Sequence, residues 1–403
     1  MLIEILIAVI IGCCFGIITG LTPGVHINLV AMILLGVSPI LLQHFAPLTL
    51  AAFIVAMSIT HTFLDFVPSV FLGAPESETA LAVLPGHRML LEGKGYEAVK
   101  LSTIGCLICL IITIALLPSL VILTPIIYKN LQSYIGWILF AVVAFMILRE
   151  HGINKKFWSF FIFMISGVLG LIVFNIYVLK DPLLPMLSGL FGISMLIMSL
   201  SEKVSIPKQK ISDDIKVDGK TLAKSCSAGT FSGSLVSIFP GMGPAQAAIL
   251  GSQITGKLGV YGFIILVGGI GTVSMLMSLV TLFSINKARN GAIIVVQEIV
   301  GKFGVNELIA MMAVSLIAAA IATLLSLYFA KVFSKLINKV NYKVLCISII
   351  IFVTLLVFFF TSWIGLLVLA TATAIGLIPN VLNIGRNHAM GCLLLPVILY
   401  FIL

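Results

Sequence analysis

The chain has 403 residues, of which 61% are hydrophobic and 9% are charged, and its formal net charge is +9. Soluble proteins carry about 25% charged residues, so this composition excludes a soluble globular class. Long apolar runs recur from end to end, and the basic residues gather in a few short loops. This arrangement predicts an all-α polytopic protein of the plasma membrane that does not bind nucleic acid.

The apolar segments, taken in chain order, form two halves with the same layout. The first half, 1–200, begins with a segment over 2–43 that a Pro-Gly pair interrupts. Uninterrupted spans are predicted after it at 47–72, 101–127, 132–149, 156–179 and 182–200. The second half, 225–403, begins with an interrupted segment over 225–257. Its uninterrupted spans are predicted at 259–283, 303–331, 343–360, 363–378 and 386–402.

The polar stretch 201–224 separates the halves and is predicted to be a solvated linker. Basic residues cluster in this stretch and in the loops 150–156 and 331–343, so all three loops are predicted to be cytoplasmic. Five spans lie between residue 47 and residue 200, and an odd number inverts the second half relative to the first. We therefore predict two membrane repeats of inverted topology, joined by a cytoplasmic linker.

Each interrupted segment then enters and leaves the membrane on the same side. The prediction is a Pro-Gly-broken re-entrant hairpin at the start of each repeat, followed by about five transmembrane helices, with the two tips meeting near the bilayer midplane. Broken backbone in hydrocarbon has to be buried in protein or line a water-filled cavity. Paired interrupted segments in two halves are typical of secondary transporters, whose site lies at the repeat interface.

The two tips carry the residue types that suit an anionic ligand. Glycine lets the backbone approach a ligand closely, and the start of the following helix presents free N–H groups with partial positive charge. A carboxylate or a phosphate fits such a site, although a simple helix kink is the alternative. The candidate substrate-binding residues are Thr22, Pro23, Gly24, His26, Asn28, Pro240, Gly241, Gly243 and Gln246.

A second candidate group lies in the span 47–72 and just after it. His61 and Asp65 are four residues apart, so they share one face of a helix. A charged side chain at membrane depth costs about 2.5–3.5 kcal/mol, so it persists where it faces a cavity, pairs or titrates. We predict an ion-coupling or gating role for His61, Asp65 and Glu76. The alternative is that Asp65 lies near the end of its span and reaches water.

A third candidate group lies at the corresponding place in the second half. The segment from Ser284 to Gly291 occupies the place that Gly73 to Thr79 occupies in the first half, through the similarity of Phe71-Leu72-Gly73 to Leu282-Phe283-Ser284. The inverted topology puts these basic residues outside, against the usual orientation bias. We therefore predict that Asn286, Lys287 and Arg289 attract an anion; ordinary surface charge is the alternative.

Motifs of other function classes are missing from the sequence. It contains no phosphate-binding loop, nucleophile elbow, kinase signature or zinc-spaced ligand set. We therefore predict no catalytic residues, no metal site and no cofactor, and transport driven by a Na⁺ or H⁺ gradient. The interpretation is a permease for a small organic anion, and not an enzyme.

Three blocks resemble the TctA-like large membrane subunit of tripartite tricarboxylate transporters. They are the glycine-spaced run from Gly12 to Pro23-Gly24, the block from Gly73-Ala74-Pro75 to Glu97-Ala98, and Pro240-Gly241-Met242-Gly243. The first tip departs from the family's Pro-Gly-x-Gly pattern by carrying His26, and the chain is shorter than most members. These departures indicate a compact branch of archaeal type.

The resemblance implies gradient-driven uptake of a di- or tricarboxylate. It also implies two partners, a small membrane subunit and an extracytoplasmic binding protein, and it leaves a homo-oligomer open. The alternative function is a translocase, or flippase, for a polyprenyl-phosphate lipid carrier, because a helix-end anion site suits a phosphate head as well. A lateral apolar opening beside Lys287 and Arg289 would favour that alternative.

Overall fold

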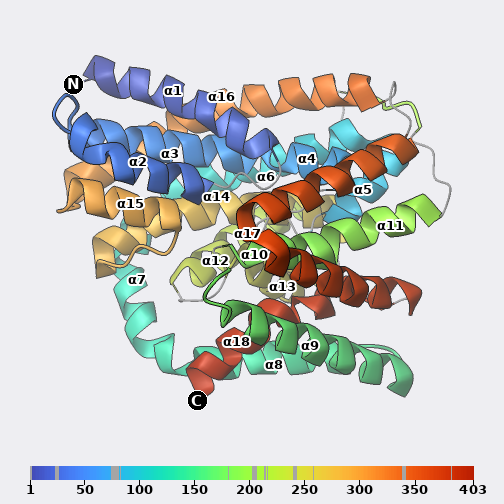
Figure 1. The fold of residues 1–403 in the computed structure, drawn as a ribbon. Helices are drawn as coiled ribbons and strands as arrows, with labels where there is room; N and C mark the ends of the chain where they lie inside the picture. Colours follow the sequence, from blue (N-terminus) through green and yellow to red (C-terminus); the bar gives the residue numbers. More distant parts are fainter. Residues whose placement is uncertain are drawn as a thin grey trace.

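The computed structural model is helical throughout its described ranges, and its elements are given in chain order in Figure 1. The structure describes residues 2–22, 27–73, 81, 83–179, 181–201, 207–212, 215, 217–238, 243–256, 258–337, 342–382 and 384–403. Eight of the described helical stretches are long and apolar enough to cross a membrane. The prediction of an all-α polytopic membrane protein is therefore confirmed.

The first half supplies the helices up to the polar stretch. These are α1 (Leu2–Leu21), α2 (Ile27–Leu41), α3 (Pro47–Leu64), α4 (Phe66–Phe71), α5 (Val83–Leu91), α6 (Gly95–Ala115), α7 (Leu117–Leu131), η1 (Gln132–Tyr134), α8 (Ile135–Leu148), α9 (Ile153–Phe174), α10 (Leu183–Leu187), the π-helix η2 (Ser188–Ile193) and α11 (Ser194–Ser201).

The second half supplies the remaining helices. These are α12 (Gly219–Ile238), α13 (Pro244–Thr255), α14 (Gly259–Ile285), α15 (Gly291–Val300), α16 (Val305–Ile337), α17 (Tyr342–Val381), η3 (Arg386–Met390) and α18 (Gly391–Ile402).

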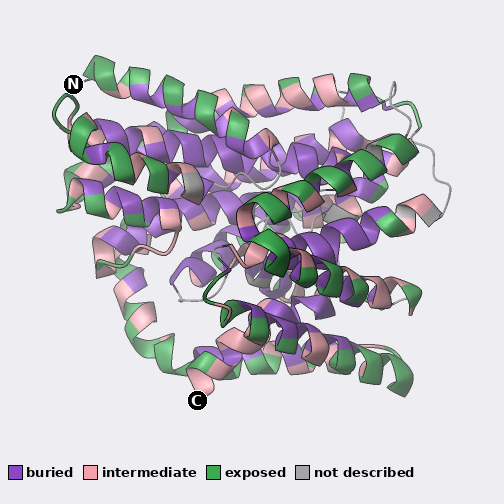
Figure 2. Ribbon diagram, in the orientation of Figure 1, coloured by how far each residue is buried: buried purple, intermediate pink, exposed green. Residues whose placement is uncertain are grey.

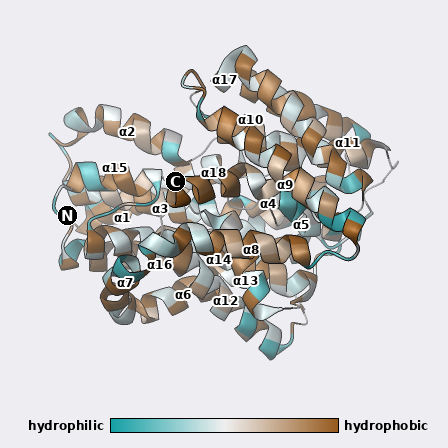
Figure 3. Cartoon of the chain, turned by 90° about the horizontal axis from the view of Figure 1, so that it is seen from below, coloured by the Kyte–Doolittle hydropathy of each residue, from teal (hydrophilic) through white to brown (hydrophobic). Residues whose placement is uncertain are grey.

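Two helices form the centre of the molecule. The apolar window of the α3–α4 stretch is 94% buried and that of α14 is 89% buried, whereas the window of α17 is 22% buried. Figure 2 shows this difference as a buried interior flanked by exposed outer helices. The outer helices α8, α9 and α17 are predominantly hydrophobic along their length (Figure 3), as contact with lipid requires.

Glycines let α1 pack directly on the backbone of α3. A Cβ atom added to Gly12 would lie 2.5 Å from the Phe53 carbonyl oxygen, and one added to Gly16 would lie 2.7 Å from the Met57 carbonyl oxygen. Small residues at such contacts are what allow helices to approach closely in a membrane. The glycine spacing of the first interrupted segment is therefore a packing face against the central helix.

The helix α12 packs on α14 in the same way. A Cβ atom added to Gly229 would lie 3.2 Å from the Leu266 carbonyl oxygen, and one added to Gly233 would lie 3.2 Å from the Ile270 carbonyl oxygen. The helix that precedes each predicted tip therefore contacts a central helix through two glycines one turn apart.

Helix ends occur at both predicted breaks. The helices α1 and α12 end at Leu21 and Ile238, and the next helices begin at Ile27 and Pro244. The predicted boundary between the spans 343–360 and 363–378 also coincides with a break, because Ser362 has φ 56° and ψ −158° inside α17. Figure 1 shows the two arms of α17 folding back on each other at that point.

One predicted span is divided in the structure. The prediction of a single helix over 101–127 is wrong, because α6 ends at Ala115 and α7 begins at Leu117. The physical reason is Pro118, which lacks a backbone N–H and clashes with the preceding turn, so it is accommodated at the start of a new helix.

Residues 209 and 210 of the polar stretch between the halves bond to the helical core. The Gln209 side chain is buried; its Oε1 accepts from the Gly95 N–H at 2.9 Å and its Nε2 donates to the Leu90 carbonyl at 2.9 Å. The Lys210 N–H donates to the Gly93 carbonyl at 2.8 Å. Gln209 and Lys210 therefore tie this part of the stretch to the turn between α5 and α6, although Pro207, Lys208 and Lys210 are exposed.

The helix ends that flank the three basic clusters lie together. Figure 1 shows the ends of α8, α11 and α16 at the right-hand end of the molecule, opposite the N-terminus and α7. The charge pattern and the arrangement of the helices are therefore consistent with each other.

Candidate functional site

The turn between α14 and α15 is held at both of its ends. Asn286 has the left-handed conformation, with φ 52° and ψ 39°, and terminates α14. Asn290 is the N-cap of α15, and its Oδ1 accepts from the Ala292 N–H at 2.8 Å. Both asparagines are residue types that favour these positions, so the sequence itself specifies the turn over 286–290.

A buried hydroxyl group fixes this turn to the central helix. Ser278 on α14 is fully buried, and its Oγ accepts from the Arg289 N–H at 3.1 Å and from the Asn290 N–H at 3.0 Å. A buried backbone donor without a partner costs about 1–3 kcal/mol, so the hydroxyl stabilises two such groups at once. The position of Arg289 is therefore set by the backbone of the turn.

The Arg289 side chain reaches the end of α12, next to the second predicted tip. Its Nη2 donates to the Ile238 carbonyl at 3.0 Å, and Ile238 is the last residue of α12. Its Nε is buried and makes no hydrogen bond within the described part of the chain. The Arg289 guanidinium group therefore has one N–H donor in the interior, beside the end of α12, that is unsatisfied among the described residues.

Lys287 lies beside the same aromatic ring as Arg289. Its Nζ donates to the Tyr128 hydroxyl at 2.7 Å and lies 4.7 Å from the ring centroid, while the Arg289 guanidinium lies 5.4 Å from that centroid. In the described ranges neither cation pairs with a carboxylate. The predicted anion-attracting residues therefore share one place, and Tyr128 joins them from α7, which the sequence did not reveal.

The start of the helix after the first tip meets this turn from the other direction. Asn28, the second residue of α2, packs against Gly291, the first residue of α15; a Cβ atom added to Gly291 would lie 2.8 Å from the Asn28 Oδ1. The segment 286–291 therefore contacts the end of α12 through Arg289 and the start of α2 through Gly291.

The other predicted tip residues fall into two groups. Thr22 is half-buried and its N–H donates to the Ile18 carbonyl at 3.1 Å, and Gly243 is half-buried immediately before α13. The remaining ones lie outside the described residues, as does the side chain of Gln246; they are Pro23, Gly24, His26, Pro240 and Gly241.

His61 and Asp65 lie in the interior, at 0% and 1% exposure. The alternative that Asp65 reaches water is therefore wrong. The neighbouring Thr62 hydroxyl lies 3.4 Å from the Thr272 hydroxyl, so α3 contacts α14 one residue from His61. Glu76 lies outside the described residues. Among the described side chains, no three His, Cys, Asp or Glu residues are placed to hold a metal ion.

Comparison with known proteins identifies the family. The family model described as "Tripartite tricarboxylate transporter TctA family" matches residues 6–391. The chain belongs to the TctA family. TctA is a family of transporters and not of enzymes, so this chain is a membrane component of tricarboxylate transport. The family assignment confirms the resemblance of its three sequence blocks.

This TctA chain also has a relative of almost equal length. It is 29% identical, over 411 aligned residues, to an uncharacterized protein of Methanocaldococcus jannaschii, and the match covers 98% of this chain and 99% of the relative. No solved structure matches the chain.

Proposed function

We propose that this TctA chain is a secondary active transporter for a di- or tricarboxylate, which binds where the 286–291 segment meets the two broken helices. The observation that carries the proposal is the bond from Arg289 to the Ile238 carbonyl, together with the contact of Gly291 with Asn28. Arg289 and Lys287 supply positive charge there, and guanidinium groups suit carboxylates in particular.

Matched contacts in the two halves support an inverted repeat over 1–200 and 225–403. Gly12 and Gly16 face α3 in the same register as Gly229 and Gly233 face α14. The same register pairs Gly73 with Asn286, and both have left-handed backbone, at φ 63° and 52°. This pairing shifts the correspondence two residues from the alignment of Gly73 with Ser284.

Helix lengths support the re-entrant hairpins. The helices α2 and α13 have 15 and 12 residues, whereas a membrane-spanning helix needs about 20. A short helix that follows a break near the midplane reaches the nearer membrane surface only. In this arrangement the basic loops are cytoplasmic, and the 286–291 segment faces the outside.

Asp65 and His61 are the groups we assign to ion coupling. The repeat register pairs Asp65 with Ser278, so a carboxyl group in the first half stands where the second half has a hydroxyl group. Ionisable groups buried in membrane helices are rare and often mark ion pathways or proton relays. We propose Na⁺ or H⁺ at this position, with a small membrane subunit and an extracytoplasmic binding protein as partners that deliver the anion.

Uptake into proteoliposomes tests the proposal. Radiolabelled citrate and succinate are offered with and without an inward Na⁺ or proton gradient, to the wild type and to Arg289→Gln. A hydrogen bond to a charged group contributes about 1.5–3 kcal/mol, so kcat/KM is expected to fall about 10- to 100-fold. The matched control is Lys302→Gln, an exposed cation just after α15 that removes the same charge.

Two results would contradict the proposal. Equal uptake by Arg289→Gln and Lys302→Gln would mean that the anion does not bind at the 286–291 segment. Failure of the wild type to take up either carboxylate, with stabilisation by a short-chain polyprenyl phosphate instead, would assign the chain to the lipid-carrier translocases.

A further inference from the structure

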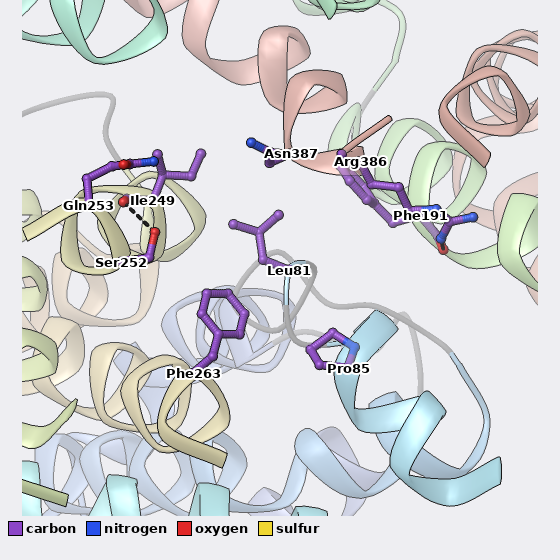
Figure 4. A pocket seen from close by; sticks show the side chains of 10 residues that line it. Leu81, Pro85, Phe191, Ile249, Ser252, Gln253, Phe263, Arg386 and Asn387 are labelled. Atoms are coloured by element: carbon purple, nitrogen blue, oxygen red, sulfur yellow. Dashed lines mark hydrogen bonds between the residues drawn. The ribbon is translucent and has the colours of Figure 1, made fainter. Parts of the chain in front are cut away.

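A cavity of about 310 Å³ lies between α13, the start of α5 and η3 (Figure 4). Its walls are largely apolar, with a few polar groups, which is the usual composition of a small-molecule site. It shares no residue with the site at 286–291. The polar residues on its walls are Ser252, Gln253, Arg386 and Asn387, and the apolar ones include Leu81, Phe191 and Phe263.

We infer that this cavity is a second anion site, in which the transported carboxylate binds before it leaves toward the end of the molecule that carries the basic loops. The inference rests on the proposed transport function for the identity of the anion. The charges and donors of the cavity itself point to an anion site.

Arg386 places an uncompensated charge at the wall. It is 8% exposed; its Nε donates to the Asn380 Oδ1 at 2.8 Å and its Nη1 to the Phe191 carbonyl at 3.4 Å. Within the described ranges no carboxylate pairs with it. A buried charge without a counterion costs several kcal/mol, so an anion in the adjacent cavity would stabilise it.

The helix beside Arg386 has the widened π geometry. Phe191 lies in the π-helix Ser188–Ile193, and short π segments occur frequently at functional sites. In Figure 4 the Arg386 guanidinium lies against this helix and not in the middle of the cavity. Arg386 therefore supplies charge from the wall, and direct contacts to the anion come from other groups.

Two amide side chains provide those contacts. Gln253 on α13 and Asn387 on η3 point toward each other across the cavity in Figure 4. The Gln253 Oε1 accepts from the Arg149 Nη1 at 3.0 Å, and this bond leaves the Nε2 group to donate. A carboxylate between the two amides would accept from both walls.

A wider cavity of about 380 Å³ adjoins the first and shares Gln253 and Asn387 with it. Its charged lining consists of Arg149, Lys155, His151 and Glu150, and the Glu150 carboxylate lies 3.0 Å from the His388 Nε2. Two permanent cations therefore face one paired carboxylate. The excess of positive charge in this wider cavity, next to the largely apolar walls of the first, should raise the local concentration of anions.

The charge of the cavity can be measured with thiol reagents on Ser252→Cys. The quantity measured is the ratio of the reaction rate of an anionic methanethiosulfonate to that of a cationic one. At Ser252→Cys this ratio is expected to be at least about fivefold higher than for free β-mercaptoethanol. Citrate and succinate should slow the reaction. The matched control is Ile254→Cys, which is 64% exposed on the same helix and does not line the cavity.

Adding Arg386→Gln to Ser252→Cys should return the rate ratio to that of the free thiol. If this variant fails to fold, Asn387→Leu provides the second test. The half-saturation constant for carboxylate offered from the side of the basic loops should rise about tenfold, and the constant for carboxylate offered from the other side should not change. A rate ratio at Ser252→Cys equal to that of the free thiol would overturn the anion site. A raised ratio with slowing by inorganic phosphate, but by neither carboxylate, would overturn the carboxylate assignment and contradict the proposed function as well.

Discussion

The helix α2 packs against α15, whereas α13 is separated from the start of α5 by a cavity. At the first place Asn28 lies in contact with Gly291. At the second, Ile249 and Gln253 line one wall and Pro85 lines another. The proposed repeat makes these two pairs equivalent, so the structure is closed at one end of the molecule and open at the other.

In the proposed transport function, this difference corresponds to one half of a transport cycle. A secondary transporter exposes its site to one side at a time. The opposite state requires α13 to close on α5 while α2 separates from α15. The contact of Asn28 with Gly291 then has to form and break in each cycle, and the cavity beside Gln253 has to fill and empty.

The largest effect is expected from Gly291→Leu. A Cβ atom there would lie 2.8 Å from the Asn28 Cγ, so the side chain prevents α2 from closing on α15. Overpacking of this kind costs about 1–3 kcal/mol, and we expect uptake of citrate in proteoliposomes to fall by about 10-fold or more. Gly36→Leu on α2 is the control, because a Cβ atom at Gly36 meets nothing within 4 Å. Equal activities of the two variants would mean that the contact does not limit the cycle.

A smaller effect is expected from Ser278→Ala. The change leaves the Arg289 and Asn290 N–H groups without their acceptor, at a cost of about 1–3 kcal/mol. The 286–290 turn should then exchange its amide hydrogens faster, and the half-saturation constant for citrate should rise about tenfold. Ser278→Thr keeps the hydroxyl group and should retain most of the affinity. Unchanged amide exchange in Ser278→Ala would show that other contacts fix the turn.

Acid should destabilise α5, which lies beside the cavity, and leave α15 unchanged. His87 on α5 is buried, its Nδ1 lies 3.0 Å from the Val70 carbonyl oxygen, and burial lowers the pKa of its side chain. Stability from the neutral ring is therefore complete above about pH 6.5 and is lost as the pH falls below it.

Hydrogen exchange checks this prediction at about pH 5.5 and about pH 7.5, after correction for intrinsic rates. Exchange in α5 should rise about threefold in acid, whereas α15, which contains no histidine, should not change. His87→Gln should remove the dependence. An equal acid effect in both helices would assign it to another group.

The smallest effect is expected from Arg149→Gln. Its bond to Gln253 joins the end of α8 to α13 at an exposed position, where such contacts contribute about 0.2–1 kcal/mol. Uptake should change by less than about fivefold, and less than in the Ser278→Ala variant. A loss as large as that of Gly291→Leu would show that this contact holds α13 in the open position.

The sequence predicts best those features that depend on nearby residues. The helices α1 and α12 end just before the predicted interruptions. The turn over 286–290 has asparagines at a left-handed position and at an N-cap, where this residue type is favoured. The division between α6 and α7 at Leu116 is also predictable, because Pro118 disfavours a continuous helix. Continuous hydropathy over 101–127 concealed it.

Features that depend on distant residues could not be predicted in this way. Tyr128 lies beside Lys287 only because α7 passes next to the 286–290 turn. The burial of Asp65 depends on the helices around α3, so the sequence left its exposure open. Arg386 stands at the start of an apolar run, where a cation ordinarily reaches the membrane surface. In the structure it is buried, and it donates to Asn380 on α17 and to the Phe191 carbonyl on η2, the second of which is distant in the sequence.

The burial of the two central helices also limits which amino-acid substitutions they can accept during evolution. Lipid accepts any apolar side chain, so the outer arms of α17 are selected for hydrophobicity and little else. The helices α3 and α14 contact protein on nearly every face, and Gly262, Gly268 and Gly269 of α14 leave no room for a methyl group. Substitutions should therefore accumulate on the outer helices, and the sequence of the central pair should record what the transporter carries.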